Sequence, residues 1–357
     1  MNKPNNKPRS VIMALVFMAL LPAGASLFGQ QTFSTTVYFN YTYYMSKSGP
    51  KTMAPPNTPN FKNNFFTFRR AYFTYENKIN DNLKFRFRID SDYVTALDKS
   101  DKPDDRLRPF IKHLYLEWSN FLPKATLKAG MADTLTFKIA EDKWGFRSVA
   151  KTLLDGYKDV TGKDIDATSA DLGASLAGTV SKELRYAVMV TNGAGYNHPE
   201  GDKHKKIAAQ VQVIPLAGFS LVGYVDYEKQ SPTANAMTYK ADAYLEMVKG
   251  LVLGAEYFSY KNGLNLTAAG TKYDVSGFSL FGRCGLIPDK LNAFARYDSY
   301  DPNAKVDKDG TSLVIAGLDW APLHSSFKLQ PNVWFTSYQD SAKKSDVIFN
   351  LTFFLSF

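Results

Sequence analysis

The sequence has little cysteine, little histidine and no long apolar run after its first 21 residues. Cys284 is the only cysteine of 357 residues, so one chain can form neither a disulfide framework nor a cysteine-based zinc cluster. The four histidines are scattered, and none lies in an H-E-x-x-H arrangement. No second run of about 18 apolar residues follows, which excludes a transmembrane helix from the remainder.

The motifs of common enzymes are missing as well. The sequence contains no G-x-S-x-G elbow and no glycine-rich phosphate loop, so it predicts neither an enzyme nor a bound cofactor. The acidic run Asp298–Asp309 lacks the final carboxylate of an EF-hand loop, and a solvated loop is the preferred interpretation over a calcium site. The net charge is +9, but 34 acids are interspersed with 43 bases, which does not indicate nucleic-acid binding.

Aromatic residues are abundant, at 14% of the chain, although the mean hydropathy is slightly negative. A transmembrane β-barrel explains this combination, because half of each strand faces a wet interior and aromatic rings gather at the membrane interfaces.

The last twelve residues, 346–357, alternate between apolar and polar side chains, as expected of a barrel strand. A soluble protein rarely leaves such an apolar strand at a sheet edge, although the last strand of a soluble sandwich is the alternative. Phe357 resembles the terminal aromatic signal of bacterial outer-membrane barrels. The expected outward face consists of Val347, Phe349, Leu351, Phe353, Leu355 and Phe357.

The first 25 residues predict a cleaved signal peptide. Basic residues precede an apolar stretch, Val11–Leu21, which is too short to span a bilayer comfortably, and small residues follow it up to Ala25. An uncleaved anchor helix is the alternative. Removing Lys3, Lys7 and Arg9 would lower the net charge from +9 to +6.

Residues 26–357 predict a single all-β domain, an antiparallel transmembrane barrel of about sixteen strands, with fourteen and eighteen as alternatives. Seven connections are short and eight are longer, which places both ends of the barrel chain on the periplasmic side. The expected strands are Thr32–Met45, Asn64–Glu76, Leu83–Val94, Phe110–Ser119, Ala125–Asp133, Asp171–Val180, Leu184–Thr191, Lys206–Ile214, Phe219–Glu228, Thr238–Val248, Leu251–Tyr260, Tyr273–Gly285, Leu291–Tyr300, Thr311–Trp320, Phe327–Tyr338 and Val347–Phe357.

The third of these strands carries an unusual density of charge. Lys84, Arg86 and Arg88 alternate with apolar residues, and Asp90 continues their face. An arginine against hydrocarbon would cost about 2–4 kcal/mol, so the charged face is expected to line the interior. There the cations would form a ladder with steps of about 6.6 Å that attracts anions. A salt-bridge network that only supports the wall is the alternative.

One connection, residues 134–170, is far longer than an ordinary loop. We expect it to fold into the barrel as a constriction loop, with a helix in its middle, residues 140–157. On such a helix Lys143, Arg147 and Lys151 would share one face, at i, i+4 and i+8, and would narrow the channel. The alternative is a loop packed on the exterior.

Two segments resemble a known family. FRRAYFTYENKINDNLKFRFRIDSDY and LKAGMADTLTF are similar to the N-terminal barrel hairpin and the following strand of the phosphate-selective porin O and P family. The resemblance implies a sixteen-stranded barrel, commonly trimeric, with an inward-folded third loop and an anion-favouring lumen.

The sequence therefore predicts a passive porin of a Gram-negative outer membrane, mildly anion-preferring, with phosphate among the candidate solutes. Its expected partners are outer-membrane lipid, small hydrophilic anionic solutes and two further copies of itself in a homotrimer; nucleic acid is not expected. Two other interpretations stay open. One is a plugged structural or adhesive barrel, and the other is a transporter of hydrophobic solutes, which the charged third strand disfavours.

Overall fold

The computed structural model describes residues 29–46, 64–93, 107–160, 165, 169–196, 199–232, 234–263 and 273–357. The predicted signal peptide, residues 1–25, lies outside the described residues. So does the whole connection between the first two strands, residues 47–63.

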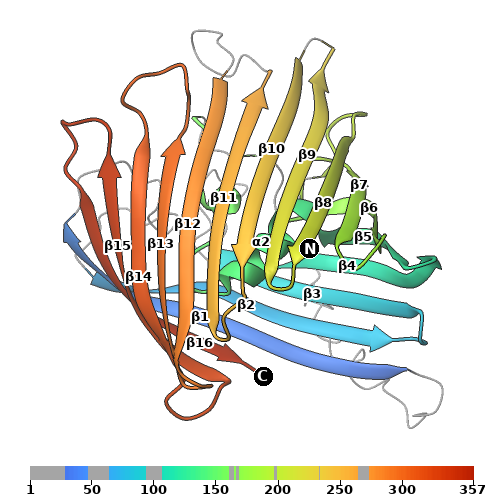
Figure 1. The fold of residues 1–357 in the computed structure, drawn as a ribbon, viewed down its shortest axis with the longest axis horizontal. Helices are drawn as coiled ribbons and strands as arrows, with labels where there is room; N and C mark the ends of the chain where they lie inside the picture. The colour runs from blue at the N-terminus through green and yellow to red at the C-terminus, as the bar shows by residue number, and fades with distance from the viewer. Residues whose placement is uncertain are drawn as a thin grey trace, which may run out of the picture.

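Sixteen antiparallel strands follow one another around a closed barrel, which confirms the predicted fold class and strand number (Figure 1). Each strand pairs with its neighbours in the sequence, and the last strand pairs with the first. The strands are β1 Gln30–Ser46, β2 Asn64–Lys78, β3 Leu83–Tyr93, β4 Leu107–Leu122, β5 Ala125–Asp133, β6 Ala170–Thr179, β7 Leu184–Thr191, β8 Lys206–Leu216, β9 Phe219–Ser231, β10 Ala234–Leu245, β11 Leu251–Asn262, β12 Tyr273–Ile287, β13 Leu291–Asp301, β14 Thr311–Trp320, β15 Phe327–Tyr338 and β16 Asp346–Ser356.

The barrel closes where β16 meets β1. Thr36 pairs with Ser356, and beyond that pair the backbones of Thr35 and Phe357 exchange two hydrogen bonds of 2.7 and 3.0 Å. The alternation expected of β16 is confirmed, because Asn350 and Thr352 are buried in the interior while the outward Leu351 is half-buried.

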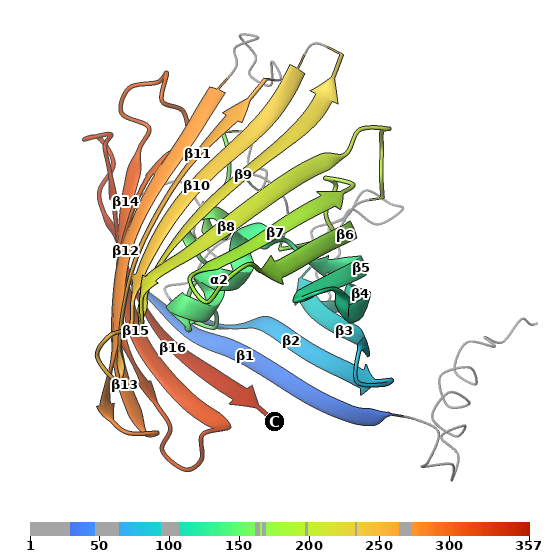
Figure 2. The same ribbon diagram turned by 45° about the vertical axis from the view of Figure 1, so that its right-hand side comes forward.

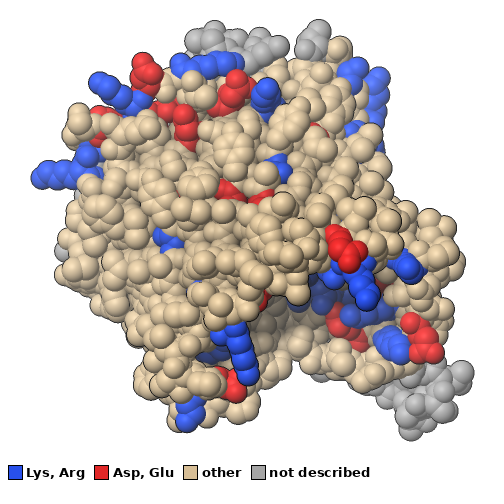
Figure 3. All heavy atoms as spheres, viewed as in Figure 1, with Lys and Arg blue, Asp and Glu red and all other residues tan. Residues whose placement is uncertain are grey.

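The outer surface is apolar along the middle of the strands, as an interior–exterior alternation requires. Figure 3 shows that Lys, Arg, Asp and Glu gather mainly towards the ends of the visible face. On the β1–β2–β16 part of this surface, Phe39 stacks on Phe353 with ring centroids 4.7 Å apart and lies parallel to Phe68. Such cross-strand aromatic pairs fix the register of neighbouring strands.

One hairpin is longer than the sequence predicts. We expected the ninth strand to end at Glu228 and the tenth to begin at Thr238, whereas β9 continues to Ser231 and β10 begins at Ala234. The intervening residues retain alternation, and Asn235 pairs with Lys229 across the extended hairpin. The tenth strand also ends earlier than predicted, at Leu245, and the turn that follows contains Gly250 in a left-handed conformation.

The long connection between β5 and β6 lies inside the barrel (Figure 2), as the sequence predicts. The described residues of this connection form two helices, α2 Leu135–Trp144 and α3 Leu153–Gly156. Helix α2 contacts β8, β10, β11 and β12, and α3 contacts β12, so the connection reaches across the interior from its origin at β5. No helix in the described residues is long and apolar enough to cross a membrane.

Candidate functional site

We call residues 134–169 the interior loop. Its described residues, 134–160, 165 and 169, pack one side against the interior of β9–β15, which we call the covered wall. Trp144 is completely buried there, with its ring edge-on to Phe281 and Phe294 at centroid distances of 5.4 and 5.8 Å. Its indole N–H donates a 3.0 Å hydrogen bond to the carbonyl of Ala150. A second apolar cluster joins the α3 end of the loop to the wall; it comprises Phe137, Leu153, Leu154, Tyr157, Ile165, Ala236, Phe258, Tyr260, Tyr273, Val275 and Tyr300.

The expected helix over residues 140–157 is wrong. Helix α2 ends at Trp144, where Gly145 adopts a left-handed conformation (φ 74°) and its N–H bonds back to the carbonyl of Glu141. Glycine is favoured at such a C-terminal position because it has no Cβ. The chain then turns so that Phe146 and Trp144 both reach the covered wall. Lys143, Arg147 and Lys151 therefore do not share a helical face.

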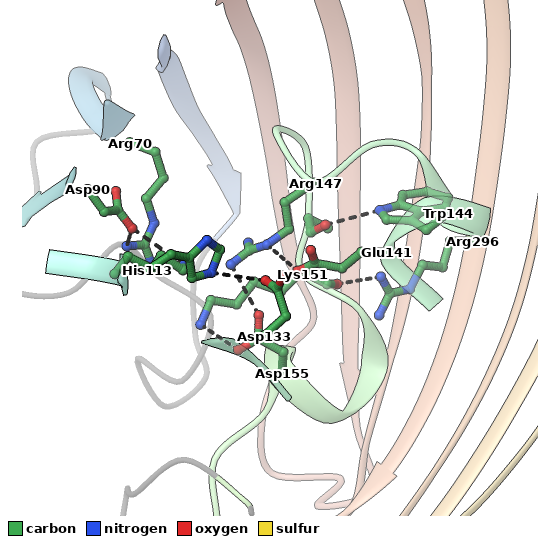
Figure 4. Close-up of polar contacts among 12 residues, drawn as sticks. Arg70, Asp90, His113, Asp133, Glu141, Trp144, Arg147, Lys151, Asp155 and Arg296 are labelled. Carbon is green, nitrogen blue, oxygen red and sulfur yellow. Dashed lines mark hydrogen bonds and ion pairs between the residues drawn. The ribbon is translucent and has the colours of Figure 1, made fainter. Parts of the chain in front are cut away.

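These three loop cations are each paired with carboxylates, and Figure 4 shows the side chains of Arg147 and Lys151 beside their partners. Arg147 contacts Glu141 at 2.8 Å and Asp155 at 3.1 Å, and Lys151 contacts Asp155 at 3.1 Å. Lys143 forms an ion pair with Glu246 beyond the end of β10. The loop thus carries balanced charge where the sequence suggested a row of cations.

Burial and neighbouring charges shift the pKa values of Asp155 and Arg147 in opposite directions. Burial alone would raise the pKa of Asp155, but Lys151 and Arg147 lower it below its ordinary value. Burial alone would lower the pKa of Arg147, but Asp155 and Tyr38 raise it above its ordinary value. Both side chains are therefore charged at neutral pH and hold one another in place.

Across from the loop, the wall formed by β2–β5 carries a second charged group. Arg70 contacts Asp90 at 2.7 Å, and Lys112 contacts the same carboxylate at 3.5 Å. His113 lies 3.0 Å from Asp133. Figure 4 shows Arg70, Asp90 and His113 facing the loop residues Arg147 and Asp155. We call the wall residues Arg70, Asp90, Lys112 and His113, together with the loop residues Arg147, Lys151 and Asp155, the constriction cluster.

A β-bulge brings both arginines of the Arg69-Arg70 pair to the interior. Tyr38 pairs with Arg70 and the next residue of β1 pairs with Phe68, so Arg69 is the extra residue. Adjacent residues normally point to opposite faces, and a bulge removes that restriction. Arg69 donates 2.9 and 2.8 Å hydrogen bonds to the carbonyls of Ser148 and Val149 in the loop, while Arg70 holds Asp90.

The β3 ladder faces the interior, as predicted. The Arg86 guanidinium pairs with Glu76 of β2 and lies over the ring of Tyr115 of β4, and Lys84 contacts Glu76 at 3.0 Å. Asp90, the fourth predicted site residue, is fully buried in the constriction cluster. Asp90 therefore fits the alternative interpretation, in which these charges form a salt-bridge network that only supports the barrel wall.

Arg88 differs from the other ladder residues. It donates a 2.8 Å hydrogen bond to the hydroxyl of Thr74, and its guanidinium lies 5.2 Å from the centre of the Tyr72 ring. Within the described part of the chain it has no carboxylate partner. Its positive charge is therefore not neutralised by a direct ion pair.

Charged side chains in the barrel interior differ in how much of their surface is exposed. On β2–β5, near the short turns, side chains in ion pairs keep 22–37% of their surface exposed; these residues, which we call the vestibule, are Glu76, Lys84, Arg86, Glu117 and Lys128. On the covered wall, Lys240, Glu256 and Arg296 are at most 3% exposed. Solvent within the barrel therefore reaches the vestibule residues of β2–β5.

Sequence reasoning missed the residues that hold the loop to the covered wall. The Tyr157 hydroxyl donates to Asp298 of β13, and Arg296 binds both Asp298 and the Lys151 carbonyl. A signal for this contact exists, because the interior-facing positions of β12 and β13 include Phe281, Phe294 and Tyr300. Large aromatic side chains on the inner face of a barrel strand indicate that something apolar covers them.

Comparison with known proteins gives similarity in structure but not in sequence. No protein-family model matches the chain, and no curated protein sequence matches it either. Among solved structures, the outer membrane channel DcaP of Acinetobacter baumannii is similar with a TM-score of 0.63 at 11% identity, covering 92% of this chain and 97% of that one. Salmonella typhi OmpF, solved with daunomycin, gives 0.62 at 10%, covering 92% and 98%.

The anion-selective porin from Comamonas acidovorans gives a TM-score of 0.58 at 12% identity, covering 92% of this chain and 99% of that one. At such low identity the similarity concerns the fold. The chain therefore has the sixteen-stranded barrel fold of outer-membrane porins.

Proposed function

We propose that this protein is a porin of a bacterial outer membrane, through which small hydrophilic solutes diffuse with a preference for anions. A barrel of sixteen strands is wide enough to enclose an aqueous channel, and the apolar outer surface suits lipid. No chemical step is involved. Export through a cleaved signal peptide, assembly as a homotrimer and membership of the phosphate-selective porin O and P family belong to the same proposal.

The observation that carries the anion preference is the charge of the accessible interior. Along β3 and β5, Lys84, Arg86, Arg88 and Lys128 face Glu76 and Glu117. Arg88 adds a cation without a carboxylate partner among the described residues. An interior with excess positive charge raises the local concentration of anions and lowers that of cations.

Replacement of Arg88 by glutamate is expected to lower the ratio of anion to cation permeability. In water, a unit charge about 5 Å from a passing ion changes the energy of that ion by about 0.8 kcal/mol. Reversing the charge therefore changes it by about 1.7 kcal/mol, which corresponds to about a fifteenfold change in the local concentration of the ion. The reversal potential of single channels in a salt gradient measures the ratio. Lys290→Glu, on the turn between β12 and β13, is the matched control; equal ratios in wild type and Arg88→Glu would disprove the assignment.

A plugged structural barrel is the second candidate, and one set of contacts favours it. The loop is tied to the covered wall, for example by the 2.6 Å hydrogen bond between Ser148 and Gln330 of β15, and it is tied to β2 on the other side by Arg69. These contacts draw the loop towards both sides of the barrel. Wild-type protein in planar bilayers decides between the two: a porin gives stepwise conductance in potassium chloride, and a plugged barrel gives none.

A further inference from the structure

A recess of about 370 Å³ opens inside the barrel at the short-turn end of β5–β8, beneath helix α2. It lies outside the constriction cluster and outside the vestibule. Its lining comprises Lys124, Thr126, Ile139, Ala177, Gly178, Thr179, Arg185, Tyr186, Ala187, Gln210 and Gln212. Its volume is at the lower end of the range of small-molecule sites.

Strand register explains why the recess exists. Ala177 of β6 pairs with Ala187 of β7, so two small methyl groups lie side by side in the lining and leave space between the neighbouring Thr126 and Gln210. In the neighbouring row, Arg185 pairs with Thr179 on one side and Gln212 on the other. Directly opposed Cβ atoms in antiparallel strands are about 4.5–5.5 Å apart, which brings the guanidinium, a hydroxyl and an amide to one edge of the recess.

The charge of the recess is positive. Arg185 and Lys124 both line it, and neither forms an ion pair with any described residue. Its lining contains no carboxylate. The side-chain N–H of Gln210 donates a 2.8 Å hydrogen bond to the Leu135 carbonyl, which fixes this amide beneath α2. The lining of the recess offers no carboxylate to pair with a cation, whereas an anion can pair with the guanidinium of Arg185.

We propose that this recess binds a small hydroxylated organic anion, such as a sugar acid. Its carboxylate or phosphate group pairs with Arg185, whose planar guanidinium suits either group in a bidentate manner. The hydroxyls of the solute exchange hydrogen bonds with Thr179 and the Gln212 amide, and its carbon skeleton rests on the Ala177 and Ala187 methyl groups. The inference rests on the proposed porin function, because it places the site on the route of a diffusing solute.

Gluconate, added on the side of the short turns to single channels in potassium chloride, tests the proposal through its block of the current. Arg185→Gln is expected to raise the half-blocking concentration by about tenfold, since a charge-assisted contact is lost. Lys182→Gln removes a cation from the same turn region without touching the recess and is expected to behave as wild type. Gln212→Ala is expected to weaken the block by gluconate but not the block by inorganic phosphate.

Each result has a defined meaning. Equal block of wild type and Arg185→Gln, or a block by neutral glucose as strong as by gluconate, overturns the site. Inorganic phosphate as effective as gluconate in every variant overturns the role of the hydroxyl contacts. If wild type gives no conductance steps at all, the proposed porin function is wrong. Calorimetric titration of gluconate into the detergent-solubilised protein then tests by itself whether the recess binds gluconate.

Discussion

Replacement of Trp144 by alanine is expected to release the interior loop and to speed its cleavage by trypsin at least about 100-fold. The side chain is completely buried, packs edge-on against Phe281 and Phe294, and donates a hydrogen bond to Ala150. Removing a buried tryptophan costs about 3–5 kcal/mol, and 1.4 kcal/mol corresponds to a factor of ten.

Trypsin detects the released loop because its basic residues become accessible when it leaves the covered wall. When opening is fast relative to cleavage, the rate follows the open population. Trp320→Ala is the matched control, because Trp320 is 47% exposed on the outside of β14 and does not touch the loop. The released variant is also expected to conduct more, with larger fluctuations. A change in cleavage rate below about threefold would show that other contacts hold the loop.

Replacement of Arg147 by alanine is expected to weaken the attachment of the loop to the barrel by about 1–3 kcal/mol. The replacement removes one of the two cations beside the buried Asp155 and leaves Lys151 as its remaining direct ion pair. Two carboxylates, Glu141 and Asp155, lose a partner, so the channel is also expected to shift towards cation selectivity. Reversal potentials and conductance fluctuations measure the two effects. Lys138→Ala is the control, because Lys138 and Asp142 form an exposed pair on the same loop, at 58% and 60% exposure, and such pairs contribute little.

The pH dependence of this loop follows from the lowered pKa of Asp155. A carboxyl group whose pKa is depressed on folding stabilises the folded state at pH values above its unfolded pKa, here about 3.8, and this contribution is lost as the pH falls through the lower folded value. Wild-type conductance is therefore expected to be steady from pH 8 to 5 as far as Asp155 is concerned. In Arg147→Ala the pKa of Asp155 rises, so fluctuations should begin at a higher pH; an identical onset in both proteins would contradict the pairing.

The barrel follows from the sequence because its signals are local. Alternation over about ten residues and tight turns such as that at Asn80 are set by neighbouring residues, and strands such as Ala125–Asp133 and Leu184–Thr191 match the prediction residue for residue. The loop interior is different. Helix α2 stops at Gly145 because Trp144 and Phe146 must both reach aromatic residues more than 130 positions later in the chain. Periodicity within the loop contains no information about that distant surface.

For the charged residues, too, the facing of a side chain is predictable from its own strand, whereas its ion-pair partner is not. Alternation was sufficient to predict that Arg86 and Arg88 face the interior, but only the register between β2 and β3 places Glu76 beside Arg86 and Thr74 beside Arg88. Which cation is neutralised therefore depends on cross-strand neighbours. The sequence did not predict a site at Arg185 because nothing in its own strand distinguishes this residue. The recess is formed by neighbours from other elements, namely the methyl groups of Ala177 and Ala187 and helix α2.

The bulge at Arg69 has a consequence for how such a pore can change over time. On one side of it Thr67 faces inwards, and on the other side Arg70 and Tyr72 do. Deleting Arg69 would leave a regular alternation in which every remaining side chain of β2 keeps its face. Insertion of a single codon is therefore enough to add a charged group to the lining while the lipid-facing pattern of the strand stays intact. Chain-length variation at this position is thus a route by which the lining can diverge without any substitution on the outer surface.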